Sequence, residues 1–312
     1  MDVSCVRRIA AVAVVSGLLS ACSPEGQRTA SLPTPPPPVQ ASAAAQPRAL
    51  EQGEPTTQRR RLNVGGVERS FLLTVPPGAD RAVKLPVIFV FHGYGEDAES
   101  IRGYTHFDRA DALVVYLDGV DKSWAPAPYA KTSGEQDLAF VDAVRAALDR
   151  EFRVDRARVF ATGLSNGGGF AAYVGCQRAQ DFTAIGTVSA AFYERVSEGC
   201  SRIPVKQIDF HGTNDAVIGY AGGERHGTVY ESVDAMLGEA AQRNHCFPAP
   251  VTTNPLPQII ERRWQQCDAA LIHYRVRGGE HVWPGGTHDR QSGSPEDYAT
   301  RRQLEFFGVD YR

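Results

Sequence analysis

Residues 159–173 read VFATGLSNGGGFAAY, and the other expected elements are organised around this segment. An apolar run leads into the pattern Gly-x-Ser-x-Gly at residues 163–167, and small residues suited to a helix start follow. In this pattern a strand turns sharply into a helix and leaves Ser165 exposed, while the two glycines give room to the crowded backbone. The helix beginning at Asn166 would direct free N–H groups to the place where an oxyanion forms in acyl transfer. A serine that only caps the helix is the alternative, but the strand before it and the helix after it favour a nucleophile.

Further apolar runs predict the other elements. Leu85–Phe91 and Leu113–Leu117 are continuous β-branched and aromatic runs, typical of strands buried on both faces. More strands are expected at Arg158–Thr162, Ala184–Ser189, Val205–Phe210 and Leu271–Val276, with an opening hairpin at Arg61–Val75 and helices at 138–152, about 229–243 and about 296–307. This alternation predicts an α/β fold: a mostly parallel central sheet of about eight strands with helices on both faces.

Chemical groups follow the carboxyl ends of these strands, where ligands bind in such sheets. Ser165, Asp215 and His281 each lie just after a strand, in the chain order Ser, Asp, His that is found in α/β-hydrolases. An imidazole can take the serine proton near neutral pH, and a carboxylate can hold the other ring nitrogen. We therefore expect Ser165 as nucleophile, His281 as base and Asp215 as the acid that orients it.

An oxyanion hole needs two donors, and we expect the backbone amides of Asn166 and Tyr94. His92 and His211 are rival bases, although a histidine in such a turn more often shapes it through a hydrogen bond. Two rivals to Asp215 are weighed in the same way: Asp118 precedes a glycine and suits a turn, and Asp137 suits the start of a helix. The eight histidines show no metal-ligand spacing, so no metal is expected.

The motifs FHGYG (91–95), GLSNGGG (163–169), HGTND (211–215) and GGEHVWPGG (278–286) together resemble secreted esterases, a group that includes feruloyl esterases and polyhydroxybutyrate depolymerases. The resemblance covers roughly residues 60–310. It implies the α/β-hydrolase fold, the same three catalytic residues, no cofactor, and hydrolysis of feruloyl-type (phenolic acid) esters or of 3-hydroxybutyrate oligomer or polymer esters. Depolymerases that attack solid polymer often carry an additional substrate-binding domain, and the sequence offers no segment for one.

Two tryptophans lie close to these motifs. Trp124 follows the carboxyl end of a strand, and Trp283 comes two residues after His281. We expect them to line the acyl or alcohol pocket, where a flat aromatic wall would suit a phenolic acyl group. The alternative is packing that only supports the catalytic loops.

The N-terminal segment has the pattern of an export signal. Arg7 and Arg8 precede an apolar run of eleven residues, too short to span a bilayer, and residues 1–21 are expected to be a signal peptide. The sequence LSAC at residues 19–22 resembles the lipobox of bacterial lipoproteins, so Cys22 is expected to be lipidated. Residues 22–58, rich in Pro, Ala, Gln and Ser, would form a linker to a catalytic domain at 59–312. The protein would then be a cell-envelope lipoprotein or secreted.

Four cysteines remain within the folded part: Cys176, Cys200, Cys246 and Cys267. Four cysteines allow three pairings, and in an exported protein disulfides are more plausible than free thiols. Pairing between sequence neighbours is the preferred interpretation.

Composition limits the possible partners. The chain has 312 residues, 42% of them hydrophobic, and a net charge of -3 without a basic patch, which argues against nucleic-acid binding. We expect a monomer that acts on a small-molecule, polysaccharide-linked or polyester substrate and meets a membrane only through Cys22. The rival functions are another acyl hydrolase (general carboxylesterase, lipase or peptidase), an acyltransferase, and a catalytically silent surface-binding lipoprotein.

Overall fold

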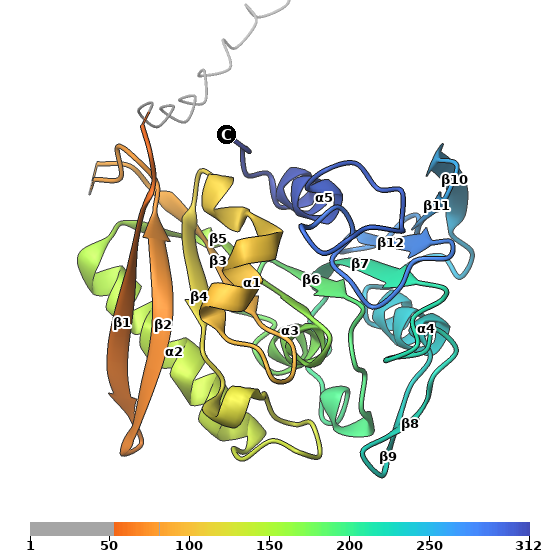
Figure 1. Ribbon diagram of the computed structural model, residues 1–312, viewed down its shortest axis with the longest axis horizontal. Coiled ribbons are helices and arrows are strands. Elements are labelled where there is room, and N and C mark those ends of the chain that lie inside the picture. Colours follow the sequence, from red (N-terminus) through yellow and green to blue (C-terminus); the bar gives the residue numbers. More distant parts are fainter. Residues whose placement is uncertain (1–52, 81) are drawn as a thin grey trace, which may run out of the picture. The chain divides into compact units, whose positions relative to one another are not determined.

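A computed structural model describes residues 53–80 and 82–312. Ten strands form one sheet in the order β1-β2-β4-β3-β5-β6-β7-β12-β11-β10 (Figure 1). Their bounds are β1 (Thr56–Val64), β2 (Val67–Val75), β3 (Leu85–Phe91), β4 (Leu113–Leu117), β5 (Val154–Leu164), β6 (Ala184–Val188), β7 (Lys206–Gly212), β10 (Val251–Leu256), β11 (Ile259–Arg263) and β12 (Leu271–Val276). A separate two-stranded sheet consists of β8 (Gly223–Arg225) and β9 (Thr228–Tyr230). The helices are α1 (Ala98–Thr105), α2 (Gly134–Glu151), α3 (Asn166–Gln177), α4 (Val233–Arg243) and α5 (Tyr298–Phe307).

The centre of the sheet is parallel and its two edges are antiparallel. Strands β4, β3, β5, β6, β7 and β12 run parallel to their neighbours within this group. The β1–β2 hairpin extends one edge and the β10–β11 hairpin extends the other, with antiparallel pairing at each step. Every residue of β3, β4 and β6 is buried, as expected for central parallel strands. The predicted α/β-hydrolase arrangement is confirmed, and all six carboxyl ends meet at one edge of the sheet.

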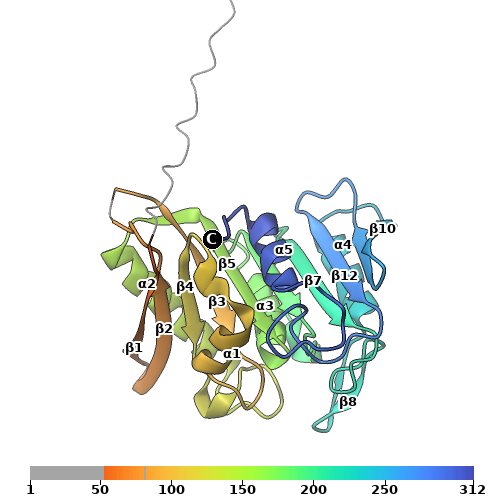
Figure 2. The same cartoon turned by 45° about the horizontal axis from the view of Figure 1, so that its top comes forward.

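Helices cover both faces of the sheet (Figures 1 and 2). Side chains of β3 alternate between the two resulting cores. Val87 and Phe89 pack with residues of α2 and α3, whereas Ile88 and Val90 pack with residues of α1 and α5. Helix α4 lies on the same face as α3, where its apolar residues pack against Leu271 of β12. A strand that is apolar at every position therefore supplies both cores at once.

The sheet has ten strands, two more than the expected number of about eight. The additional hairpin, β10–β11, occupies the proline-containing segment between Cys246 and Cys267, where no strand was expected. Pro255 lies where the pairing register shifts between Thr253 and Leu256. Because β10 is the edge strand, a residue without a backbone N–H is tolerated there.

Two further elements differ from expectation. Strand β1 begins at Thr56, five residues before the expected start of the hairpin at Arg61. Helix α1 was not expected at all; Asp97 caps it by accepting the Ser100 amide at 3.0 Å. An acidic cap followed by a short run containing Gly103 was too weak a pattern to separate this helix from a loop.

The four cysteines form the two disulfides expected from sequence neighbours, Cys176–Cys200 and Cys246–Cys267. This pairing is consistent with export into an oxidising compartment. The expected signal peptide, Cys22 and residues 22–52 of the linker lie outside the described residues. Within residues 53–80 and 82–312, no helix is both long enough and apolar enough to cross a bilayer.

Candidate active site

Ser165 occupies a sharp turn between β5 and α3. Its backbone has φ 56° and ψ −118°, a conformation that residues other than glycine rarely adopt. Backbone hydrogen bonds hold it there: its N–H donates to the Val188 carbonyl at 2.9 Å, and its carbonyl accepts from Gly169 and Ala191 at 2.9 and 3.0 Å. Ser165 is the N-cap residue of α3, yet its side chain makes no capping hydrogen bond. The hydroxyl is therefore available for another role.

The glycines on either side of Ser165 are sterically required. A Cβ on Gly163 would lie 2.4 Å from the Gly167 carbonyl oxygen, and a Cβ on Gly167 would lie 2.1 Å from the Phe91 carbonyl oxygen. Both distances are far below van der Waals contact with backbone atoms that cannot move away. The end of β5, the start of α3 and the end of β3 are thus packed backbone to backbone, which fixes the position of the serine.

Asp215 and His281 form a hydrogen-bonded pair at the ends of β7 and β12. The His281 Nδ1 lies 2.8 Å from the Asp215 Oδ2. The other oxygen, Oδ1, accepts the amides of Val217 and Ile218 at 2.9 and 2.8 Å. Burial acts to raise the pKa of Asp215, but hydrogen bonds from His211, His281 and the backbone outweigh it and hold that pKa well below its usual range. An ionised Asp215 can fix the proton of His281 on Nδ1 and leave Nε2 as the basic nitrogen.

Ser165 and His281 line the same cleft, which has a volume of about 220 Å³. The other lining residues are Gly93, Tyr94, Glu96, Tyr129, Leu164, Tyr193, Val217, Ile218, Arg225 and His226. Several of these are aromatic and in mutual contact: the ring of Tyr129 lies 4.4 Å from that of Tyr94, 4.6 Å from that of His226 and 6.1 Å from that of Tyr193, between centroids. One part of the cleft wall is therefore a cluster of aromatic rings.

The two amides expected to bind an oxyanion lie at the turns flanking Ser165. Within residues 53–80 and 82–312 neither the Tyr94 amide nor the Asn166 amide donates to a protein acceptor. The turn after β3 is fixed by Gly93 and Gly95, whose amides donate to Glu96 Oε2 and to the Lys122 carbonyl, each at 2.9 Å. The amide of Asn166 lies at the N-terminus of α3, where helix geometry leaves N–H groups without an intrahelical partner.

His92 is engaged in structural hydrogen bonds. The Gly119 amide donates to its Nε2 at 2.9 Å, so its proton lies on Nδ1, which is 2.7 Å from the Gly93 carbonyl. Burial lowers the pKa of His92. With both ring nitrogens occupied, this buried histidine shapes the turn, as the structural alternative suggested.

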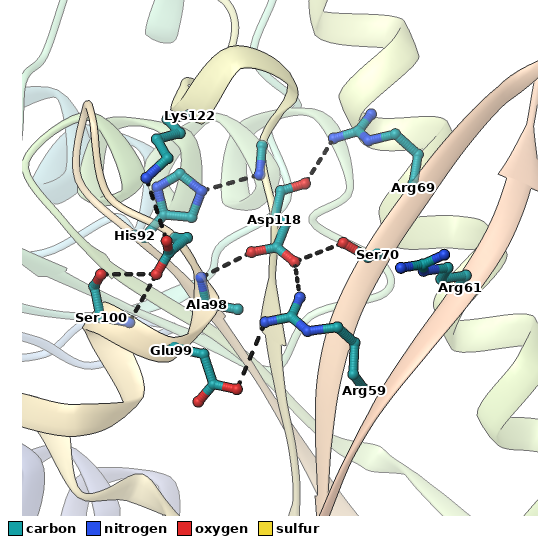
Figure 3. A network of polar contacts seen from close by, with 12 residues as sticks. Arg59, Arg61, Arg69, Ser70, His92, Ala98, Glu99, Ser100, Asp118 and Lys122 are labelled. Carbon is teal, nitrogen blue, oxygen red and sulfur yellow. Dashed lines mark hydrogen bonds and ion pairs between the residues drawn. The ribbon is translucent and has the colours of Figure 1, made fainter.

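The two rival carboxylates are likewise engaged. Figure 3 shows Asp118 surrounded by donors: Ser70 donates to Oδ2 at 2.7 Å, the Ala98 amide donates to Oδ1 at 2.8 Å, and Arg59 contacts Oδ2. Asp137 is fully buried in the first turn of α2 and pairs with Arg69 at 3.0 Å. Neither carboxylate lines the cleft.

The expectation that Trp124 and Trp283 line the pocket is wrong. Their exposed fractions are 0% and 2%, and neither belongs to the cleft. Trp124 stacks on Phe170 with ring centroids 5.0 Å apart, and its backbone exchanges two hydrogen bonds with the Asn166 side chain at 2.8 and 2.9 Å. The indole N–H of Trp283 donates to Thr300 Oγ1 at 3.0 Å. A position after a strand end did not indicate which way the indole points.

The aromatic residues that line the cleft were missed. Tyr129 and Tyr193 lie in loops, and His226 is in the turn of the β8–β9 hairpin. The only sequence signal was the dipeptide His226-Gly227 between two short runs, and strands of three residues leave almost no alternation to recognise. Outside the cleft, a larger cavity of about 460 Å³ lies beside the Cys176–Cys200 disulfide and contains no residue of the expected site.

In the part of the chain that the structure describes, no group of three or more His, Cys, Asp or Glu side chains is arranged to hold a metal ion. The chemistry available at the cleft is that of Ser165, the Asp215–His281 pair and the backbone amides around them. Such a set suits nucleophilic attack by a serine on a carbonyl carbon.

The chain is similar in sequence to known esterases. No protein-family model matches the chain. It is 26% identical over 246 residues to "Probable feruloyl esterase C" of Aspergillus terreus, covering 75% of this chain and 83% of that protein. It is 25% identical to "Feruloyl esterase D" of Neurospora crassa, covering 83% of this chain and 86% of that protein. Among solved structures, the acetyl xylan esterase of Aspergillus awamori superposes with a TM-score of 0.55 at 13% identity, covering 80% and 99% of the two chains, which bears on the fold alone. The resemblance to feruloyl esterases is confirmed, and it supports an enzyme that hydrolyses carboxylic esters.

Proposed function

We propose that the protein is a serine esterase that cleaves esters of phenolic acids through an acyl-enzyme. The observation that carries the proposal is the strained turn at Ser165, which opens into the same cleft as a histidine held by a buried aspartate. The sequence similarity to feruloyl esterases supports the same activity.

In the first half-reaction, the Ser165 Oγ attacks the ester carbonyl carbon while His281 Nε2 takes the hydroxyl proton. The negative charge that develops on the carbonyl oxygen is stabilised by the Tyr94 and Asn166 amides, and one such donor contributes about 3 kcal/mol. Collapse of the tetrahedral intermediate breaks the bond to the alcohol oxygen, which receives the proton from His281. The acid remains attached to Ser165 as an ester.

In the second half-reaction, a water molecule attacks the acyl-enzyme and gives a proton to His281. The same two amides stabilise the second oxyanion. Its collapse releases the acid and returns the proton to Ser165. Asp215 stays ionised throughout and stabilises the imidazolium that forms in each half-reaction.

The aromatic wall of the cleft supports a phenolic acyl group as the preferred substrate. A planar cinnamoyl-type ring can contact the exposed Tyr94 and the rings of Tyr129 and His226 packed beside it. An acyl chain without a ring would gain less from these contacts. In this proposal, Tyr94, Tyr129 and His226 contact the aromatic acid, in place of the two tryptophans that were expected from the sequence.

A substrate panel tests the proposal. Initial rates are measured with methyl ferulate, 3-hydroxybutyrate oligomers and p-nitrophenyl acetate, with the Ser165→Ala variant as the control. We expect kcat/KM to be largest for methyl ferulate. A higher kcat/KM for the hydroxybutyrate oligomers would reject the phenolic substrate. If no ester is hydrolysed in a way that depends on Ser165, the esterase proposal fails and a catalytically silent binding protein is favoured.

The proposal places the enzyme outside the cytoplasm. Residues 1–21 would be removed, Cys22 would carry lipid, and the following linker would separate the catalytic domain from the membrane surface. Mass spectrometry of the native N-terminal peptide tests this part. A lipidated Cys22 is expected, and an unmodified N-terminus anywhere in residues 20–30 would reject the anchor.

A further inference from the structure

Asp215 has a second histidine beside it. His211 is 1% exposed, and its Nε2 lies 2.8 Å from the Ile218 carbonyl oxygen and 3.4 Å from the Asp215 Oδ2. A carbonyl oxygen only accepts hydrogen bonds, so the His211 Nε2 carries a proton and donates it. The Asp215 oxygen that faces His281 therefore also faces the N–H group of a buried histidine that does not line the cleft.

His211 acts on a turn that is already bonded to Asp215. The Val217 and Ile218 amides donate to the Asp215 Oδ1, and His211 binds the carbonyl of the same Ile218. The turn and the carboxylate therefore restrain each other through both oxygens. Burial acts to lower the pKa of His211, but the hydrogen bond to Asp215 and the charge of Asp209 raise it overall, which favours N–H donation to this turn.

A second buried chain of hydrogen bonds anchors the residues that follow the turn. His273 Nδ1 lies 2.7 Å from Asp209 Oδ2, and its Nε2 lies 2.8 Å from the Tyr220 hydroxyl. Thr187 donates to the other oxygen of Asp209 at 2.5 Å. Asp209 and His273 are directly paired in the parallel ladder between β7 and β12, so this chain is fixed by the sheet.

Protonation of this chain is settled by the same reasoning. Burial lowers the pKa of His273, which favours the neutral ring. With Nδ1–H donated to Asp209, the Nε2 accepts the hydroxyl proton of Tyr220. The ring of Tyr220 in turn contacts that of His211 edge to face, with centroids 5.8 Å apart. The segment from Asp215 to Tyr220 is therefore held at its start by His211 and at its end by the sheet.

We propose that His211 is a positioning residue: it holds the Asp215 turn so that Oδ2 faces the His281 Nδ1, with the Asp209–His273–Tyr220 chain as its support. The inference rests on the proposed function, because it assigns His211 a role in the Asp215–His281 pair. It predicts that the donor at the Nε2 position matters for turnover, while the imidazole ring as such does not.

Three substitutions separate the donor from the ring. His211→Gln places an amide N–H near the position of Nε2, His211→Asn is too short to reach the Ile218 carbonyl, and His211→Leu fills the space without a donor. We expect kcat of the Gln variant within about threefold of wild type. The Asn and Leu variants should lose about 100-fold in kcat with little change in KM, because a small misplacement at a catalytic centre has an effect of that order.

A spectroscopic measurement tests the inference without relying on turnover. The proton shared by His281 Nδ1 and Asp215 should give a low-field proton resonance in wild type and in His211→Gln, and this resonance should be lost or shifted in His211→Leu. Thermal unfolding confirms that each variant compared is folded. If the Leu variant does not fold, the comparison of Gln with Asn still decides.

Equal kcat for wild type, Gln and Asn, with an unchanged His281 resonance, would overturn the inference and leave the proposed function standing. A Gln variant as impaired as the Asn variant would also overturn it, because the ring and not the donor would then be required. If wild type itself hydrolyses no ester, the proposed function fails, and the resonance alone decides whether His211 orders the Asp215–His281 pair.

Discussion

Two carboxylates at the same edge of the sheet have different hydrogen-bond partners. Asp118 follows β4 and Asp215 follows β7, and both side chains are largely shielded from solvent. Both oxygens of Asp118 accept hydrogen bonds, from donors in β2, α1 and β1. In Asp215 one oxygen accepts from amides of its own turn, and the other faces His281. The position of a carboxylate after a strand therefore does not decide its partners. Asp215 can pair with a histidine because one of its oxygens is not used by the surrounding backbone.

The largest effect is expected at the nucleophile and the base. We predict that Ser165→Ala and His281→Ala each lower kcat/KM for an ester by about four to six orders of magnitude, and that the double variant is hardly worse, because the groups act as one unit. Esterase assays on folded variants, checked by thermal unfolding, measure this. Either single variant that retains a tenth of the activity would reject the assignment.

The comparison itself is tested by replacing each carboxylate with its amide. Asp215→Asn should lower kcat by about 10⁴-fold, because an amide no longer fixes the tautomer of His281. Asp118→Asn should change kcat by less than about tenfold and instead lower the free energy of unfolding by about 1–3 kcal/mol, since its charged hydrogen bonds are weakened. Chemical denaturation and kinetics on the same preparations give both quantities. The reverse pattern would exchange the roles of the two residues.

A smaller effect on activity should distinguish Tyr129 in the cleft wall from Trp124 in the core. Trp124→Ala should lower the free energy of unfolding by about 3–5 kcal/mol and reduce the rates on methyl ferulate and p-nitrophenyl acetate by the same factor. Tyr129→Ala should reduce kcat/KM for methyl ferulate about tenfold more than for the acetate, because only the aromatic acid contacts the wall. If Trp124→Ala reduces the rate on methyl ferulate more than the rate on p-nitrophenyl acetate, Trp124 would contact the substrate after all.

The smallest effect is expected on the free energy of unfolding when Asp97 is replaced. This carboxylate caps α1 and does not line the cleft. Hydrogen bonds from the hydroxyl and amide of Ser100 lower the pKa of Asp97 to about 2. A lowered carboxyl pKa contributes stability above the unfolded value of about 4, and this contribution is lost as the pH falls towards 2. Asp97→Ala should therefore cost about 1 kcal/mol at pH 7 and less at pH 3. Asp97→Asn is the control, since it keeps the cap; an Asp97→Ala cost that does not change with pH would contradict the account.

The parts that the sequence predicted are those fixed by local backbone geometry. The turn at Ser165 requires Gly163 and Gly167 because of contacts with neighbouring backbone. The motif, read together with the strand before it and the helix after it, was therefore enough to place the turn. The central strands were recognised because burial on both faces makes every position apolar. The position of Asp215 and His281 after parallel strands then followed from the topology.

The parts that the sequence did not predict depend on contacts between distant segments. The cleft wall combines Tyr129, Tyr193 and His226 from three separate loops, and no local pattern brings them together. The β10–β11 hairpin was not recognised because it contains two prolines. The proline within β10 is tolerated there because β10 is the edge strand of the sheet. The indoles of Trp124 and Trp283 turn towards the core, and residue order alone does not specify side-chain direction.

Covalent labelling can identify the nucleophile and its base in one experiment. A fluorophosphonate reacts with a serine only when a neighbouring base activates its hydroxyl, so the site of its attachment identifies the nucleophile. We expect a label on Ser165 by peptide mass spectrometry in wild type and in Asp118→Asn, a strongly slowed reaction in Asp215→Asn, and no reaction in His281→Ala. A label on another serine, or labelling of Ser165 that is equally fast in His281→Ala, would reject Ser165 as a nucleophile activated by His281.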